Sequence, residues 1–173
     1  MVHLVPGLGQ LRSRLIDRLG KNTYLAGYAL LSLLGIVLVV YGKSRAEFQP
    51  VWFPPDWSRE FVIGVMAVAF YLFAAGDMKS NLKRYTNHPM LWGIVLWSAA
   101  HLLANGDLAS ILLFSSFLVF SLFAMFSINK RGSAKQKESY GFKRDVLVVI
   151  AGLLAYGVFM VFLHPWLIGV AIV

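Results

Sequence analysis

Residues 88–114 read HPMLWGIVLWSAAHLLANGDLASILLF, and this stretch decides the fold. It joins two apolar runs, residues 89–104 and 108–128, through a three-residue connection. A membrane-crossing helix needs about 20 largely apolar residues, with a range of roughly 17–25. The second run meets that length, and the first falls slightly short of it. The stretch therefore predicts a hairpin of two lipid-embedded helices.

The polar residues of this stretch mark the ends of the two helices. Pro89 suits the first turn of a helix, which places His88 at about its N-cap. Gly106 is expected to take the left-handed conformation that closes the first helix. Asp107 is expected to cap the second helix by accepting a hydrogen bond from a first-turn amide. The sequence Asn-Gly-Asp thus predicts a tight turn.

The composition of the whole chain also indicates a membrane protein. The 173 residues are 58% hydrophobic and 14% charged, with a mean hydropathy of +0.68. Soluble domains carry about 25% charged residues. The net charge of +8 comes from Lys and Arg residues that lie between the apolar runs, so we expect no nucleic-acid partner. The absence of cysteine excludes disulfides, thiolate metal sites and cysteine nucleophiles.

We predict an all-α, polytopic membrane helical bundle with five transmembrane helices, occupying residues 23–173. The expected spans are 23–41, 60–76, 89–104, 108–128 and 146–172. If the N-terminus is cytoplasmic, thirteen of the sixteen basic residues lie on the inner side, as the positive-inside rule requires. We therefore expect a multi-pass protein of the bacterial inner membrane, with the lipid bilayer as its main partner.

Residues 1–22 are expected to form a separate segment on the inner surface. Leu8, Leu11, Leu15 and Leu19 recur at three- and four-residue steps among arginines, which predicts a short amphipathic helix. Gly20 is expected to end it. An ordinary solvated helix would show the same pattern. The loop 42–59 is expected to place aromatic rings in the outer headgroup layer or to cap an outer pocket, and 129–144 is expected to be a solvated inner linker.

Four histidines, His3, His88, His101 and His164, are the candidate functional groups. Ionisable residues in membrane segments are costly and suggest function. Thirteen residues of helix separate His88 from His101 by roughly 20 Å, so the two cannot bind one metal ion. The expected depths of the histidines in the membrane permit an inner pair, His3 with His88, and an outer pair, His101 with His164. Either pair can provide both axial ligands of a haem. Alternatively, each histidine serves capping or packing alone.

Asn105 lies four residues after His101 and therefore on the same helix face. A side-chain hydrogen bond from Asn105 would orient the His101 ring, as groups around a cofactor ligand often do. Asn105 is therefore included among the candidate cofactor-binding residues.

Residues 88–114, HPMLWGIVLWSAAHLLANGDLASILLF, closely resemble the signature of the NnrU family. The members of this family are integral membrane proteins named from bacterial nitric-oxide and nitrite reduction gene clusters. The plant 15-cis-zeta-carotene isomerase is a relative. The similarity extends to RSRLIDRLGKNTYLAGYALLSLLGIVLVVYG, VWFPPDW and FLHPWLIGV, and so covers nearly the whole chain. The family usually has a further apolar helix that ends in a histidine. His3 resembles that histidine, and the leading helix is expected to be missing here.

The resemblance implies haem b, with His3 and His88 as the leading candidates for ligands of the haem iron and His101 as a further candidate. It implies a haem-associated membrane protein linked to nitrite and nitric oxide metabolism, that is, to denitrification. One alternative is a haem-dependent cis–trans isomerase of a polyene or carotenoid-like lipid, which would bind a hydrophobic small molecule. Another is a non-catalytic membrane helper, so catalysis is left open.

Overall fold

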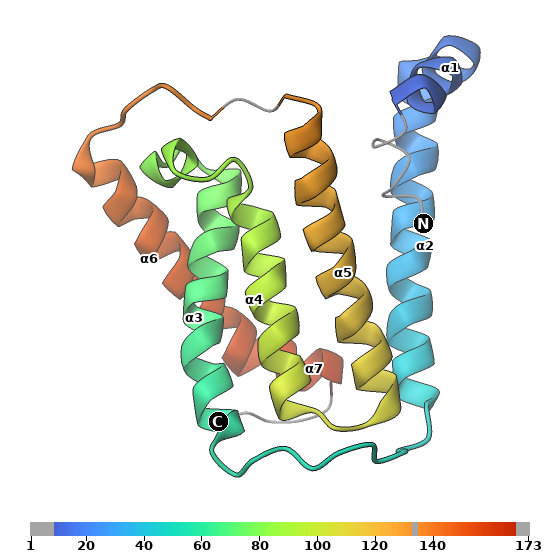
Figure 1. Ribbon diagram of the computed structural model, residues 1–173, viewed down its shortest axis with the longest axis vertical. Helices are drawn as coiled ribbons and strands as arrows, with labels where there is room; N and C mark the ends of the chain where they lie inside the picture. Colours follow the sequence, from blue (N-terminus) through green and yellow to red (C-terminus); the bar gives the residue numbers. More distant parts are fainter. Residues whose placement is uncertain (1–8, 133–134, 169–173) are drawn as a thin grey trace. The chain divides into compact units, whose positions relative to one another are not determined.

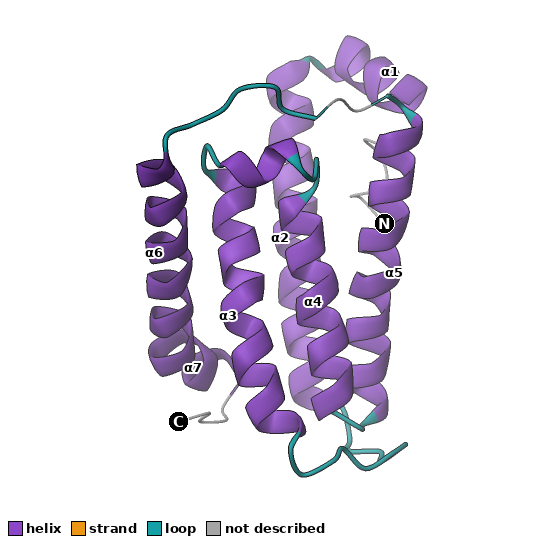
Figure 2. Ribbon diagram, turned by 60° about the vertical axis from the view of Figure 1, so that its left-hand side comes forward, coloured by secondary structure: helices purple, strands orange, loops and turns teal. Residues whose placement is uncertain are grey.

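The computed structural model describes residues 9–132 and 135–168, and every regular element within these ranges is a helix (Figure 1, Figure 2). The all-α prediction is thereby confirmed. The elements are α1 (Gly9–Leu19), α2 (Lys21–Arg45), α3 (Ser58–Asp77), η2 (Asn81–Arg84), α4 (Pro89–Ala104), α5 (Leu108–Lys130), α6 (Phe142–Val158), η3 (Phe159–Leu163) and α7 (His164–Ile168).

The chain forms two compact units, Met1–Glu47 and Phe48–Val173. The first unit contains α1 and α2. Gly20 lies between them with a φ of 80°, a left-handed conformation that costs glycine little and that ends α1 where the sequence predicted. The Gly20 carbonyl then accepts the Tyr24 amide at 3.1 Å, which starts the next helix. The expected helix in the N-terminal segment is thus confirmed, whereas its position on a membrane surface stays a prediction.

In the second unit α4 packs between α3 and α5, and α6 packs against α3 (Figure 1). Glycines allow the helices of this unit to approach one another closely. A Cβ atom at Gly152 of α6 would lie 2.8 Å from the Cα of Tyr71 on α3, and one at Gly93 of α4 would lie 2.5 Å from the Phe73 ring. Such backbone proximity is how helices gain dispersion energy in lipid, where no hydrophobic effect drives them together.

The turn between α4 and α5 differs from the predicted one. Gly106 does not have a positive φ. Instead its carbonyl oxygen accepts hydrogen bonds from the amides of Val51 and Trp52, at 2.8 and 3.2 Å. A Cβ atom at this position would collide with the Trp52 carbonyl oxygen, so the site requires glycine for space. The predicted N-cap of α5 is confirmed, because the Asp107 carboxylate accepts a hydrogen bond from the Ser110 amide at 3.0 Å.

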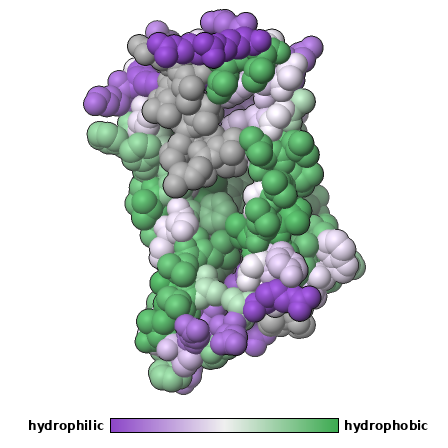
Figure 3. All heavy atoms as spheres, turned by 90° about the vertical axis from the view of Figure 1, so that its right-hand side faces the viewer, coloured by the Kyte–Doolittle hydropathy of each residue, from purple (hydrophilic) through white to green (hydrophobic). Residues whose placement is uncertain are grey.

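Four helical segments are long and apolar enough to cross a membrane: Lys21–Arg45, Ser58–Asp77, Leu108–Lys130 and Phe142–Leu167. Helix α4 is apolar but shorter. Large hydrophobic side chains are exposed along these helices, and in Figure 3 they cover the middle of the visible face while hydrophilic ones gather toward its ends. By helix length and hydropathy, the chain is therefore a multi-pass membrane protein whose outer surface suits a bilayer.

The last apolar run, expected as a single span, changes its helical geometry near the end. Residues Phe159–Leu163 form a π-helical turn, closed by a hydrogen bond from the His164 amide to the Phe159 carbonyl. Pro165 follows directly. A proline ring clashes with the carbonyl four residues earlier, which here belongs to Val161, and a wider turn relieves that clash.

The described part of the inner linker is mostly exposed, as expected, and hydrogen bonds also attach it to the rest of the second unit. The Asn81 side chain donates to the Tyr140 carbonyl at 2.8 Å, and the Tyr140 amide donates back to Asn81 Oδ1 at 2.8 Å. The Gln136 amide donates to the Lys83 carbonyl at 3.3 Å. A polar segment that could be solvated is thus fixed by the short helix η2, because Asn81 offers both a donor and an acceptor.

Candidate functional site

Helix α4 carries one candidate histidine at each end. His88 is its N-cap residue, Pro89 is in the first turn, and His101 lies in the last turn. Because α4 is continuous between them, the two rings are separated by about 20 Å along its axis. The prediction that these two histidines cannot share a single metal ion is confirmed.

The inner histidine is held by a residue that the sequence reasoning missed. His88 Nε2 lies 2.8 Å from Oδ1 of Asn129, near the end of α5. Since an amide oxygen only accepts, Nε2 carries the hydrogen in this bond and Nδ1 keeps the free lone pair. The signal was present in the sequence, because Asn129 directly follows the apolar run 108–128, and a hairpin of two helices returns that end of the chain to His88.

A pocket of about 390 Å³ adjoins His88. Trp92, Leu122 and Met125 give it apolar walls, and Lys135 brings a positive charge to it. The remaining lining residues are polar or aromatic: Tyr85, Thr86, Asn87 and Asn129. None of its described lining residues is acidic, so these residues combine an imidazole, apolar walls and a positive charge, and we call this the inner pocket.

The outer histidine is packed among aromatic rings. The His101 ring lies 4.7 Å from the Phe114 ring and 5.3 Å from the Trp97 ring, measured between centroids. Its Nδ1 lies 2.8 Å from the Trp97 carbonyl oxygen, so Nδ1 carries the hydrogen and Nε2 keeps the lone pair. His164, at the start of α7, lies close enough to interact electrostatically with His101. The outer pair as joint ligands of one group stays a prediction.

Asn105 does not orient the His101 ring. Its side-chain amide donates to the backbone carbonyl of His101 at 2.8 Å and so closes the last turn of α4. The ring itself is oriented by the Trp97 carbonyl. An asparagine at a helix C-terminus finds an unpaired carbonyl within reach, and this local bond replaces the expected contact with the ring.

His3 lies outside the described residues, so the inner pair of His3 with His88 stays a prediction. Within residues 9–132 and 135–168, no three His, Asp or Glu side chains are grouped so as to hold a metal ion. A ligand set of two imidazoles is compatible with haem, in which the porphyrin supplies the other four iron ligands.

The profile of the family described as NnrU protein matches residues 1–172. The chain belongs to the NnrU family. No curated protein and no solved structure is significantly similar to it. The two histidine sites described above are therefore properties of an NnrU protein whose chain folds into apolar, membrane-compatible helices.

Proposed function

We propose that this NnrU protein is a haem-associated protein of the bacterial cytoplasmic membrane that supports nitrite and nitric oxide metabolism. We propose haem b as the cofactor and the inner pocket as its site. The observation that carries the proposal is the His88–Asn129 hydrogen bond at the wall of the pocket of about 390 Å³.

The residues of the inner pocket fit a haem group. When a histidine ligates a metal through one ring nitrogen, a neighbouring group commonly forms a hydrogen bond with the other ring nitrogen, and Asn129 forms such a bond with His88. Trp92 and Met125 would face the apolar macrocycle, and Lys135 has the charge to pair with a propionate. By the family resemblance, His3 would be a second residue that holds the haem. When bound, haem would supply redox or Lewis-acid chemistry, which belongs to the cofactor.

The proposal includes five membrane crossings, with α4 as the short one. Its 16 residues give a length of about 24 Å, less than the roughly 30 Å hydrocarbon core. Local thinning of the bilayer can accommodate this difference. The basic residues after α3 and after α5 then lie in the cytoplasm together with the N-terminus. In this orientation His88 is near the inner face and His101 near the outer face.

An absorption spectrum of the purified protein in detergent tests the proposal. Haem-replete cells should give a protein with a Soret band that shifts on reduction with dithionite. His88→Ala should abolish the band, and His101→Ala, a matched change in the same helix, should preserve it. Asn129→Leu should retain haem but change its reduction potential, because the His88 ring loses its hydrogen-bond acceptor.

Two outcomes would contradict the proposal. A haem-free protein from haem-replete cells would remove haem association and favour the helper alternative. Loss of the band in His101→Ala or His164→Ala with retention in His88→Ala would move the site to the outer pair. The isomerase alternative stays a prediction and requires a polyene substrate assay.

A further inference from the structure

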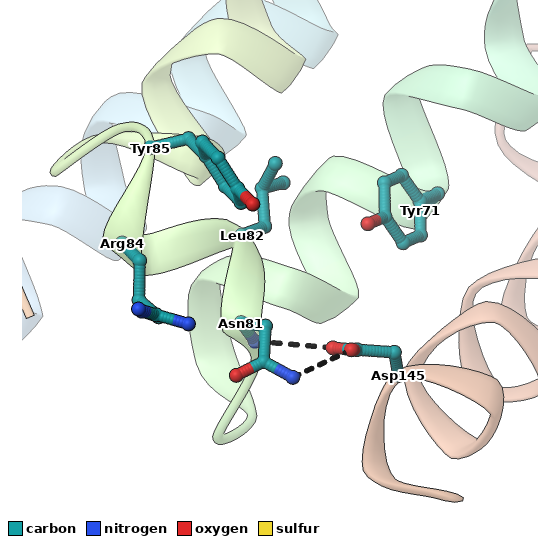
Figure 4. Close-up of a pocket in the computed structure, with 6 residues that line it drawn as sticks. All are labelled: Tyr71, Asn81, Leu82, Arg84, Tyr85 and Asp145. Carbon is teal, nitrogen blue, oxygen red and sulfur yellow. Dashed lines mark hydrogen bonds between the residues drawn. The ribbon is translucent and has the colours of Figure 1, made fainter. Parts of the chain in front are cut away.

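A second pocket, of about 360 Å³, is lined in part by Asn81, which also hydrogen-bonds Tyr140 of the inner linker (Figure 4). It is formed where α3, η2 and α6 meet. Its lining residues are Tyr71, Asn81, Leu82, Arg84, Tyr85 and Asp145. Neither His88 nor Asn129 lines it, and Tyr85 is the one described residue that lines both this pocket and the site proposed for haem.

The pocket contains one acidic and one basic group. The Asp145 carboxylate is fixed by Asn81, whose backbone amide and side-chain amide donate to its two oxygens at 3.1 and 2.7 Å. Each carboxylate oxygen can accept a further hydrogen bond. On the other side of Asn81, Arg84 donates from Nη1 to the Ser139 hydroxyl at 3.3 Å, and its other N–H groups make no hydrogen bond to a described residue (Figure 4). In the described part of the chain, no ion pair joins Asp145 to Arg84.

Tyr71 adds a hydroxyl that points toward the pocket from α3 (Figure 4). It makes no hydrogen bond to any residue within 9–132 or 135–168. Asp145 lines the same pocket, so the Tyr71 hydroxyl and the Asp145 carboxylate can both contact one ligand. Together they present oxygen acceptors to a cation, while Arg84 presents N–H donors to an anion.

The depth of the pocket matches the headgroup layer of a bilayer. Helix α3 ends at Asp77 and α6 begins at Phe142, so the pocket lies where the apolar segments end. Tyr85 and Phe142 are 74% and 81% exposed there, as aromatic residues of membrane interfaces are. A ligand at this depth would keep its acyl chains along the apolar helices and its headgroup in the pocket.

We propose that this pocket binds the headgroup of a phospholipid with a primary amine, such as phosphatidylethanolamine. The ammonium donates hydrogen bonds to Asp145 and Tyr71, and the phosphate accepts them from Arg84. A choline headgroup lacks N–H donors and loses the first set of bonds. A glycerol headgroup leaves the Asp145 carboxylate without a cation and brings a net negative charge toward it. The inference rests on the proposed membrane crossings and is independent of haem.

The experiment measures lipid binding to the full chain in detergent. Native mass spectrometry compares phosphatidylethanolamine, phosphatidylcholine and phosphatidylglycerol with identical acyl chains. We expect the ethanolamine lipid to bind about tenfold more tightly than either of the others, which is about 1.4 kcal/mol, because only its ammonium donates hydrogen bonds to the charged carboxylate. Arg84→Gln should reduce its affinity about tenfold, whereas Lys83→Gln, the same charge change outside the pocket, should leave it unchanged.

Tyr71→Phe tests the amine directly and removes no hydrogen bond within the described protein. It should bring the affinity for phosphatidylethanolamine down to that for phosphatidylcholine. Equal binding of the three lipids would overturn the proposal, as would equal effects of Arg84→Gln and Lys83→Gln. Preference for phosphatidylglycerol would instead indicate a general basic surface. None of these results changes the Soret band, so failure here is distinguishable from failure of the haem proposal.

Discussion

Replacing Gly106 with alanine should destabilise the protein through a clash at one atom. The added Cβ would collide with the Trp52 carbonyl oxygen, so the loop around Val51 and Trp52 must move away. That movement breaks the two hydrogen bonds to the Gly106 carbonyl and strains the bond from the Leu108 amide to the Gln49 carbonyl. At about 0.5–1.5 kcal/mol for each of the two broken bonds, the loss is about 1–3 kcal/mol. We expect about 2 kcal/mol, the middle of this range.

The assay is unfolding of the detergent-solubilised full chain by increasing SDS, followed by circular dichroism. Gly64→Ala is the matched control, because it lies inside α3 with nothing within 4 Å of an added Cβ atom. Alanine should be neutral there or stabilise the helix by about 0.5–1 kcal/mol. The reasoning would be refuted if Gly106→Ala unfolded within about 0.5 kcal/mol of the wild type, the usual range for harmless surface changes.

Two further changes concern the inner linker. Asn81→Ala removes the hydrogen bonds to Asp145 and Tyr140, so trypsin should cleave the linker several times faster, whereas the exposed control Asp77→Asn should not alter the rate. The hydrogen bond from the Tyr140 hydroxyl to Glu138, 2.6 Å long, raises the pKa of Tyr140 above its ordinary 10.0. Its stabilising effect should be complete below pH 10.0 and lost as the pH rises through the raised pKa. The phenolate absorbance difference between the wild type and Tyr140→Phe measures this, and a midpoint at or below 10.0 would contradict it.

The helices were predictable because their signals are local. Apolar runs of sufficient length, Pro89 at a helix start and Asp107 at a cap each depend on a few neighbouring residues. The separation of His88 from His101 followed from helix geometry alone. These features need no knowledge of which helices pack together.

The remaining features depend on residues that are distant in the sequence. Asn129 contacts His88 across 41 residues, and Asn81 contacts Asp145 across 64. The role of Gly106 depends on the Trp52 carbonyl, and periodicity carries no information about that contact. The role of Asn105 was predicted wrongly. Its spacing from His101 shows that both lie on one helix face, but spacing does not tell whether the Asn105 side chain bonds the His101 ring or the His101 carbonyl.

The π turn before His164 has a consequence for the direction of that side chain. Each residue of an α-helix advances about 100° around the axis, so one additional residue in a turn rotates everything beyond it by that angle. The His164 ring lies 6.1 Å from the Phe159 ring, measured between centroids, at the end of this widened turn. A regular α-helix through the same residues would turn this imidazole by about a quarter of a circle, away from the neighbours that it now has.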